Sequence, residues 1–137
     1  MKTPTITEQL QSIAASDYFE ADSGDLTQAW EAAGAGIEAV EPVLRFMEDH
    51  PEIDFGSPGS LAHFIERFYR KGYEAKLVES IERKPTTHTI WMLHRVINGA
   101  KEPALRQHYV DLLKRAGQHP LADEDTRLEV EDFLLGL

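Results

Sequence analysis

The residues best suited to catalysis or metal binding in this chain are its six histidines and its 24 carboxylates. His63 and Glu66 stand three apart in a predicted helix, and such a pair supplies half of a helical-bundle metal site. A complete site needs further carboxylates and a Glu-x-x-His motif, which does not occur, and there is no Cys to add a thiolate. We therefore predict no metal and no other cofactor.

Two other patterns fall short of a functional motif. The acidic run Asp123–Asp125 resembles the start of a calcium loop, but Leu128 stands where that loop needs its sixth-position glycine. Gly34 and Gly36 lack the preceding strand and the third glycine of a dinucleotide-binding turn. The sequence therefore predicts no catalytic residues and no enzyme.

The acidic charge is concentrated in the first part of the chain. The net charge is −10. Residues 1–60 hold two basic and twelve acidic side chains, whereas residues 61–137 hold twelve of each. Nucleic-acid binding is not predicted, because phosphate contacts need clustered Lys and Arg. The charge favours a basic protein partner, although an acidic surface that serves only solubility is an alternative.

An acidic segment at the end of a predicted helix is our candidate partner-binding site. Its acids continue from the last helical turn, where the helix dipole disfavours them, into a loop, so local folding does not require them. The predicted contacts, all expected at the surface, are Glu48, Asp49, Glu52 and Asp54, with Asp22, Asp25 and Glu31 as neighbours. The alternative is that these are only solvated loop acids.

The elements that position these residues are all predicted to be helical. Apolar residues recur at steps of three and four through most of the chain, and Pro, Gly and capping residues separate the periodic segments. We expect loops at residues 21–24 and 51–59. The expected helices cover residues 5–15, 25–35, 39–49, a segment capped by Ser57 or Ser60 that runs to Arg70, residues 73–83, 87–98 and 103–116, and a last segment capped by Asp123 or Asp125 that runs to Leu137. One kinked helix over residues 25–49 is the alternative to the second and third.

The helix over residues 87–98 is expected to lie at the centre of the fold. Thr86 and Thr87 provide N-cap chemistry after Pro85. Its apolar residues cover more than half of its circumference, which is typical of a helix buried on several sides.

We predict an all-α fold of about seven helices, arranged as an irregular antiparallel bundle or a short HEAT-like α-α stack. It should be one domain over residues 1–137, with acidic helices in 1–55 and a helix-pair region in 56–137. No signal-peptide pattern and no apolar run of about 20 residues is present, so we expect a cytoplasmic protein without a membrane partner.

Two segments of the chain, Gly56–Glu66 and Lys84–Asn98, resemble small helical bacterial proteins that are encoded beside polymorphic or contact-dependent toxins. Those proteins act as immunity proteins. The resemblance covers about residues 56–135 and implies a cytosolic antidote that binds one toxin and blocks its active site. Many such toxins are basic nucleases, which would suit the net charge of −10.

Three hypotheses for the function follow from these observations. The leading one is a non-enzymatic, immunity-type antidote that occludes a basic toxin. The second is a helical adaptor or scaffold protein that binds a peptide or a partner helix. The third and weakest is an enzyme with a His/carboxylate metal site.

Overall fold

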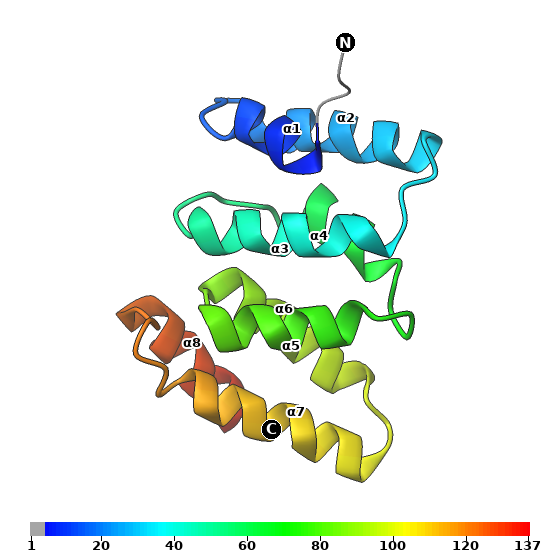
Figure 1. Cartoon of the computed structure of the whole chain (residues 1–137). Coiled ribbons are helices and arrows are strands. Elements are labelled where there is room, and N and C mark those ends of the chain that lie inside the picture. The colour runs from blue at the N-terminus through cyan, green and yellow to red at the C-terminus, as the bar shows by residue number, and fades with distance from the viewer. Residues whose placement is uncertain (1–4) are drawn as a thin grey trace. The chain divides into compact units, whose positions relative to one another are not determined.

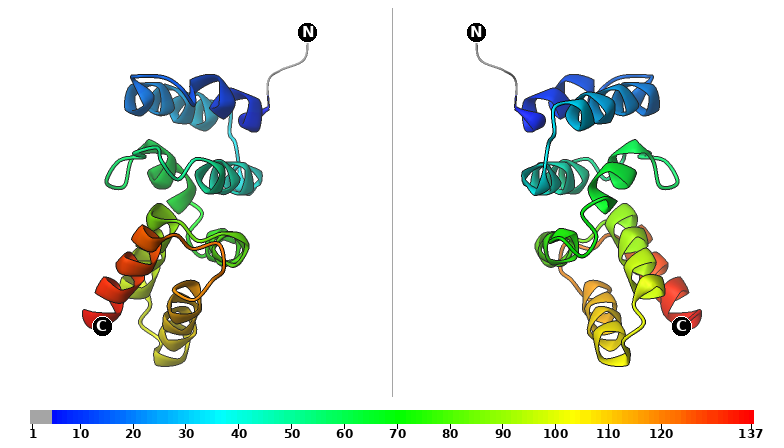
Figure 2. Two further views of the ribbon diagram at one scale, coloured as in Figure 1. Left: turned by 90° about the vertical axis from the view of Figure 1, so that its left-hand side faces the viewer. Right: turned by 90° about the vertical axis from the view of Figure 1, so that its right-hand side faces the viewer.

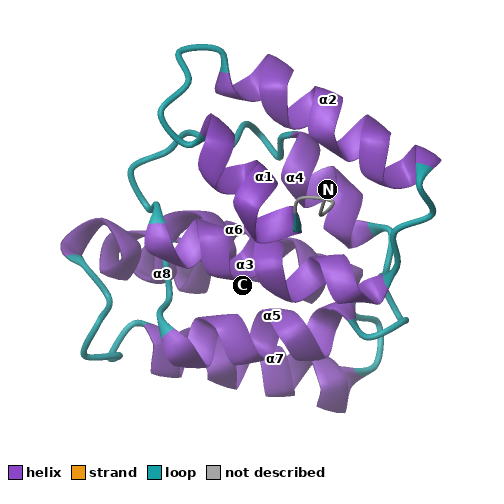
Figure 3. Cartoon of the chain, turned by 45° about the horizontal axis from the view of Figure 1, so that its top comes forward, coloured by secondary structure: helices purple, strands orange, loops and turns teal. Residues whose placement is uncertain are grey.

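The computed structural model describes residues 5–137 and is built from α-helices (Figure 1). Within this range 69% of the residues are helical and none belongs to a strand (Figure 3), which confirms the predicted all-α fold. No helix in these residues has both the length and the apolar character needed to cross a bilayer. The eight α-helices are α1 (Ile6–Ile13), α2 (Phe19–Ala32), α3 (Val40–Asp49), α4 (Ser60–Glu66), α5 (Tyr73–Arg83), α6 (Thr87–Gly99), α7 (Pro103–Ala116) and α8 (Glu124–Leu135).

The chain divides after Tyr73 into two compact units. We call the described residues 5–73 unit 1 and residues 74–137 unit 2. Helix α4, which belongs to the predicted helix-pair region 56–137, packs on α2 and α3 of unit 1. The prediction of a single domain, and the choice between a bundle and a HEAT-like stack, stay predictions.

Unit 1 is built around α3, which packs against α1, α4 and the short 3₁₀ segment η1 (Ile37–Ala39). Most of α3 is buried. Between α2 and α4, the rings of Trp30 and Phe64 form an edge-to-face contact at 5.3 Å between centroids. The Trp30 indole N–H donates to Gln9 Oε1 of α1 at 2.8 Å, so the buried ring is also satisfied at its polar end.

Unit 2 is built around α6, which packs against α7 and α8. Thr86 caps α6 and forms a reciprocal pair of hydrogen bonds with Thr89. Leu93 has no exposed surface. The expected start of this helix is therefore confirmed, and α5 has the predicted bounds.

Two predicted helix boundaries differ most from the structure. Residues 21–24, predicted as a loop, lie inside α2, which begins six residues earlier than expected. Ser23 and Gly24 are buried or half-buried there, and the Ser23 hydroxyl donates to the Glu20 carbonyl instead of opening a turn. The helix predicted to reach Arg70 ends at Glu66, and turns occupy residues 67–72.

Candidate functional site

The loop between α3 and α4 is fixed to unit 1 by aromatic side chains. In Figure 2 this loop extends away from the helices that flank it. At its start the His50 ring stacks on Phe46 at 4.3 Å between centroids. Phe55 is buried, and its ring makes edge contacts with Phe19 at 5.7 Å and with Phe46 at 6.1 Å. The loop residues beyond Phe55 are therefore held in a defined place over α2.

The segment after Phe55 makes a tight turn that needs two glycines. Gly56 and Gly59 have φ angles of +101° and +89°, which L side chains rarely adopt. A Cβ at Gly59 would collide with the Phe55 carbonyl oxygen, and a Cβ at Gly56 would lie 2.6 Å from Gly59 Cα. Asp54 Oδ1 accepts a hydrogen bond from the Gly56 N–H at 3.0 Å, which orients that carboxylate beside the turn.

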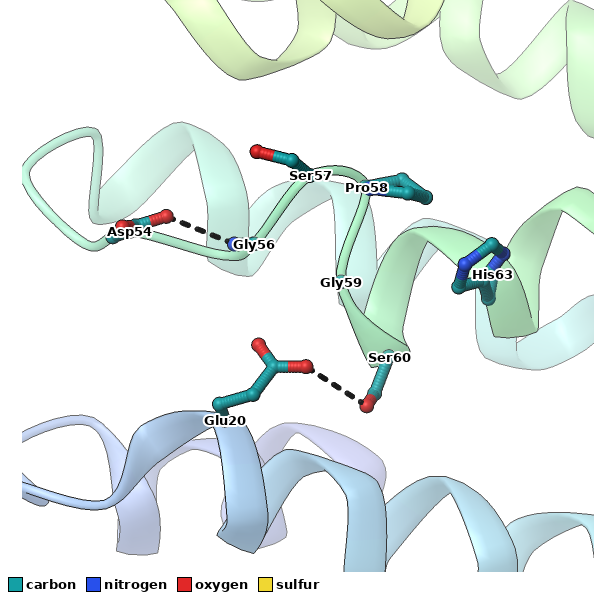
Figure 4. A pocket seen from close by; sticks show the side chains of 8 residues that line it. All are labelled: Glu20, Asp54, Gly56, Ser57, Pro58, Gly59, Ser60 and His63. Carbon is teal, nitrogen blue, oxygen red and sulfur yellow. Dashed lines mark hydrogen bonds between the residues drawn. The ribbon is translucent and has the colours of Figure 1, made fainter.

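This turn forms one wall of a cavity of about 470 Å³ within unit 1 (Figure 4). Glu20 reaches up from the first turn of α2, and the Ser60 hydroxyl at the start of α4 donates to Glu20 Oε1 at 3.4 Å. We call this cavity the acidic pocket. Its lining residues are Glu20, Asp54, Gly56, Ser57, Pro58, Gly59, Ser60 and His63.

The acidic pocket is suited to a cationic group. Two carboxylates line it, and no Lys or Arg does. Neither Glu20 nor Asp54 forms an ion pair with another described residue. Ionised carboxylates accept hydrogen bonds only, and they match a guanidinium or an ammonium group. The volume lies in the range of ligand-binding pockets, and the lining is more polar than in most of them.

The predicted contact segment is only partly at the surface. Asp54 lines the acidic pocket, and Asp49 and Glu52 are exposed. Glu48 is only 6% exposed, so the prediction that it lies at the surface was wrong. The reason is its place on α3, where it follows the buried Leu44 by four residues and so lies on the same inward face.

The three predicted neighbours on α2 are not gathered around the pocket. Asp22 is half-buried, and its Oδ2 accepts a hydrogen bond from the Ser16 hydroxyl at 2.5 Å. Asp25 is exposed. Glu31 forms an exposed ion pair with Arg67 at 3.2 Å.

Sequence reasoning missed Glu20 and Ser60 as site residues. Glu20 lies in the segment before the expected start of α2, and forty residues separate it from Ser60. The sequence signal nearest to the site was the run Gly56–Gly59. It indicated a turn, but it did not indicate that Glu20 lies opposite that turn.

The histidine–carboxylate pair of the sequence, His63 and Glu66, lies on α4. His63 borders the acidic pocket (Figure 4), but residues 5–137 contain no group of three or more His, Asp or Glu side chains placed to hold a metal ion.

Comparison with protein-family models found no match, and comparisons with curated proteins and with solved structures found none either. No residue role is therefore transferred from another protein. The resemblance to immunity proteins stays a prediction, and the function has to be argued from the site.

Proposed function

We propose that this chain is a non-enzymatic, immunity-type antidote that binds a basic toxin in the cytoplasm and occludes it. In this proposal a Lys or Arg side chain of the toxin enters the acidic pocket. The observation that carries the proposal is that Glu20 and Asp54 line one cavity and that no Lys or Arg lines it.

The charge of unit 1 supports the same partner. Residues 5–73 hold thirteen acidic and four basic side chains, which gives a net charge of −9. Residues 74–137 hold eleven acidic and nine basic side chains, which gives a net charge of −2. A basic protein is therefore attracted more strongly to unit 1 than to unit 2. Asp49 and Glu52, both exposed on the loop that leads to the pocket, add to this attraction.

The geometry also favours a preformed surface. The loop is anchored by Phe55, and its turn depends on backbone conformations that glycine adopts. A partner that binds a fixed loop does not have to order it, so less binding energy is lost.

The proposal is tested by capturing the partner with the tagged full-length chain from a lysate of the source organism. The captured protein is identified by mass spectrometry, purified and assayed for activity. We expect a basic protein whose activity is lost when the chain is added in equal amount. A captured partner that keeps its full activity would contradict an antidote role.

A pair of variants separates the acidic pocket from charge in general. Glu20→Gln with Asp54→Asn removes both pocket charges, and Glu102→Gln with Asp111→Asn removes two exposed charges from unit 2. The pocket variant should bind the partner about tenfold more weakly, because truncating one side of a charge pair commonly costs 2 kcal/mol or more. The control should bind as the wild type does. Equal affinity of the two variants would remove the pocket from the proposal.

A further inference from the structure

The second surface of interest is the outer side of α8 in unit 2, which is separate from the acidic pocket. The inner side of α8 faces its neighbours. Phe133 stacks on His94 of α6 at 4.0 Å between centroids, and the space between Val130 and Gly117 after α7 leaves little room for a Cβ at that glycine. Thr126 and Val130 are buried.

The opposite side of α8 exposes two leucines. Leu128 is 51% exposed and Leu135 is 87% exposed. Seven residues make nearly two turns, so both side chains leave the helix in the same direction, about 10.5 Å apart along its axis. Single exposed leucines are common, but an aligned pair on one helix face is the pattern through which helices pair.

Four carboxylates border this leucine pair, two on each side. Glu124 and Asp125 precede Leu128 by four and three residues, and Glu131 and Asp132 follow it by three and four. Residues at these spacings are neighbours on a helix surface. All four side chains are exposed. We call these six residues the α8 stripe.

Local folding does not account for all of these acids. Glu124 and Asp125 lie in the first turn, where the helix dipole favours them. Glu131 and Asp132 lie near the other end, where it disfavours them. Glu131 also borders a small hollow with Lys114 and Arg127, but none of the four acids forms an ion pair with a described residue.

We propose that the α8 stripe docks an amphipathic helix of a partner protein whose apolar residues are flanked by Lys or Arg. The leucines would lose their exposed surface against the apolar side of that helix. The carboxylates on both sides of the leucines would pair with Lys or Arg on both sides of the apolar residues of the partner helix. Charged residues beside the seam of a coiled coil select a partner in the same way.

A second copy of this chain fits the stripe poorly. Pairing two α8 helices through their leucines would bring four carboxylates of one copy against four of the other. Like charges that face each other at an interface are strongly unfavourable. The charge of the stripe therefore selects a basic helix.

Synthetic peptides of about 20 residues provide the test. The first carries three leucines at seven-residue spacing with Lys on both sides, the second has Glu in place of each Lys, and the third is a scrambled form of the first. Binding to the full-length chain is measured by calorimetry and mapped by leucine methyl NMR. We expect the first peptide to bind and to shift Leu128 and Leu135, and the other two to bind at least about tenfold more weakly.

Variants of the chain separate the stripe from other surfaces. Leu128→Gln with Leu135→Gln should weaken binding of the Lys peptide by about tenfold or more, whereas Leu105→Gln, at an exposed leucine of α7, should not. Reversing Glu124, Asp125, Glu131 and Asp132 to Lys should transfer the preference to the Glu peptide. Circular dichroism confirms that each variant is folded.

Three outcomes would overturn the proposal. The first is equal binding of the Lys peptide and its scrambled form. The second is binding that the Leu128 and Leu135 changes leave intact. The third is a wild-type dimer, seen by sedimentation, that these two changes dissociate, because the stripe would then serve self-association. Glu20→Gln with Asp54→Asn should leave peptide binding at α8 unchanged, so failure here is distinct from failure of the acidic pocket.

Discussion

At the scale of single residues, the acidic pocket depends on two backbone positions. Gly56 and Gly59 let the chain turn sharply after Phe55, so that Asp54 and Ser60 border the same cavity. A side chain at either position would displace the turn. The backbone conformation of the two glycines therefore determines the shape of the pocket, and the carboxylates of Glu20 and Asp54 line it.

Gly59→Ala should destabilise the protein by about 1–3 kcal/mol, because Ala is strained at this φ and its Cβ would collide with the Phe55 carbonyl oxygen. Urea unfolding measures the loss. Gly34→Ala is the matched control, since Gly34 also has a positive φ of +74° but its added Cβ would meet nothing within 4 Å. Similar losses for the two variants would show that the collision is unimportant.

Asp123 makes the stability of α8 depend on pH. The pKa of Asp123 is held below its ordinary value, first by the Thr126 side chain, then by the Thr126 backbone N–H, with Arg127 and Lys84 contributing less. Because folding favours the ionised form, this contribution is fully present above the ordinary value of 3.8 and is lost as pH falls through the lowered pKa.

Asp123→Ala should cost about 0.5–2 kcal/mol at neutral pH, since it removes the N-cap of α8. The cost should shrink in acid below the lowered pKa. Asp123→Asn keeps an acceptor and should cost less. Urea unfolding across the acid range checks this, and a cost of Asp123→Ala that stays constant down to the lowest pH would contradict the assignment.

At the scale of elements, the boundaries that sequence predicts well are those with local chemistry. Thr86 and Pro103 mark helix starts through capping and fixed φ, and both starts are where they were expected. The start of α2 was missed because Ser23 and Gly24 are turn formers, whereas packing of Phe19 on Phe46 and Phe55 extends the helix. Contacts between segments far apart in sequence override local preference there.

The candidate site was predictable only in part for the same reason. Asp54 was named from its acidic surroundings, but nothing local indicates that Glu20 approaches Ser60 across forty residues. Glu48 was placed at the surface because it belongs to an acidic run that continues from the last turn of a helix into a loop. Its spacing of four from Leu44 and eight from Val40 carried the opposite signal.

Leu93→Ala tests the central place of α6 in unit 2. Leu93 is fully buried, so the truncation should cost about 2–5 kcal/mol. Leu128→Ala, at a half-exposed position of α8, should cost less than about 0.5 kcal/mol. Urea unfolding of both variants gives the comparison. If Leu93→Ala lowered the free energy of unfolding by less than about 0.5 kcal/mol, α6 would not be central to the hydrophobic core of unit 2.

At the scale of the whole molecule, the two units differ in charge. Unit 1 combines a strong acidic excess with a preformed pocket, and unit 2 is nearly neutral apart from the local acids of the α8 stripe. Attraction of a basic partner should therefore act mainly through unit 1. Such attraction speeds encounter and weakens as salt screens it.

The most direct test of the central claim is the association rate with the captured partner at low and high salt. One variant reverses Glu20, Asp49, Glu52 and Asp54 to Lys; Glu48 is left unchanged because a lysine there would be buried. The control reverses four exposed acids of unit 2, namely Glu79, Glu82, Glu102 and Asp111. Each set changes the net charge from −10 to about −2.

We expect the unit 1 variant to associate about tenfold more slowly or worse at low salt, because electrostatic steering raises association rates by about 10–10³. The association rate of the control should fall much less, and the difference in rate between the two variants should become smaller at high salt. Equal losses in both variants would mean that the attraction is diffuse. Unchanged rates in both would contradict a charge-guided antidote.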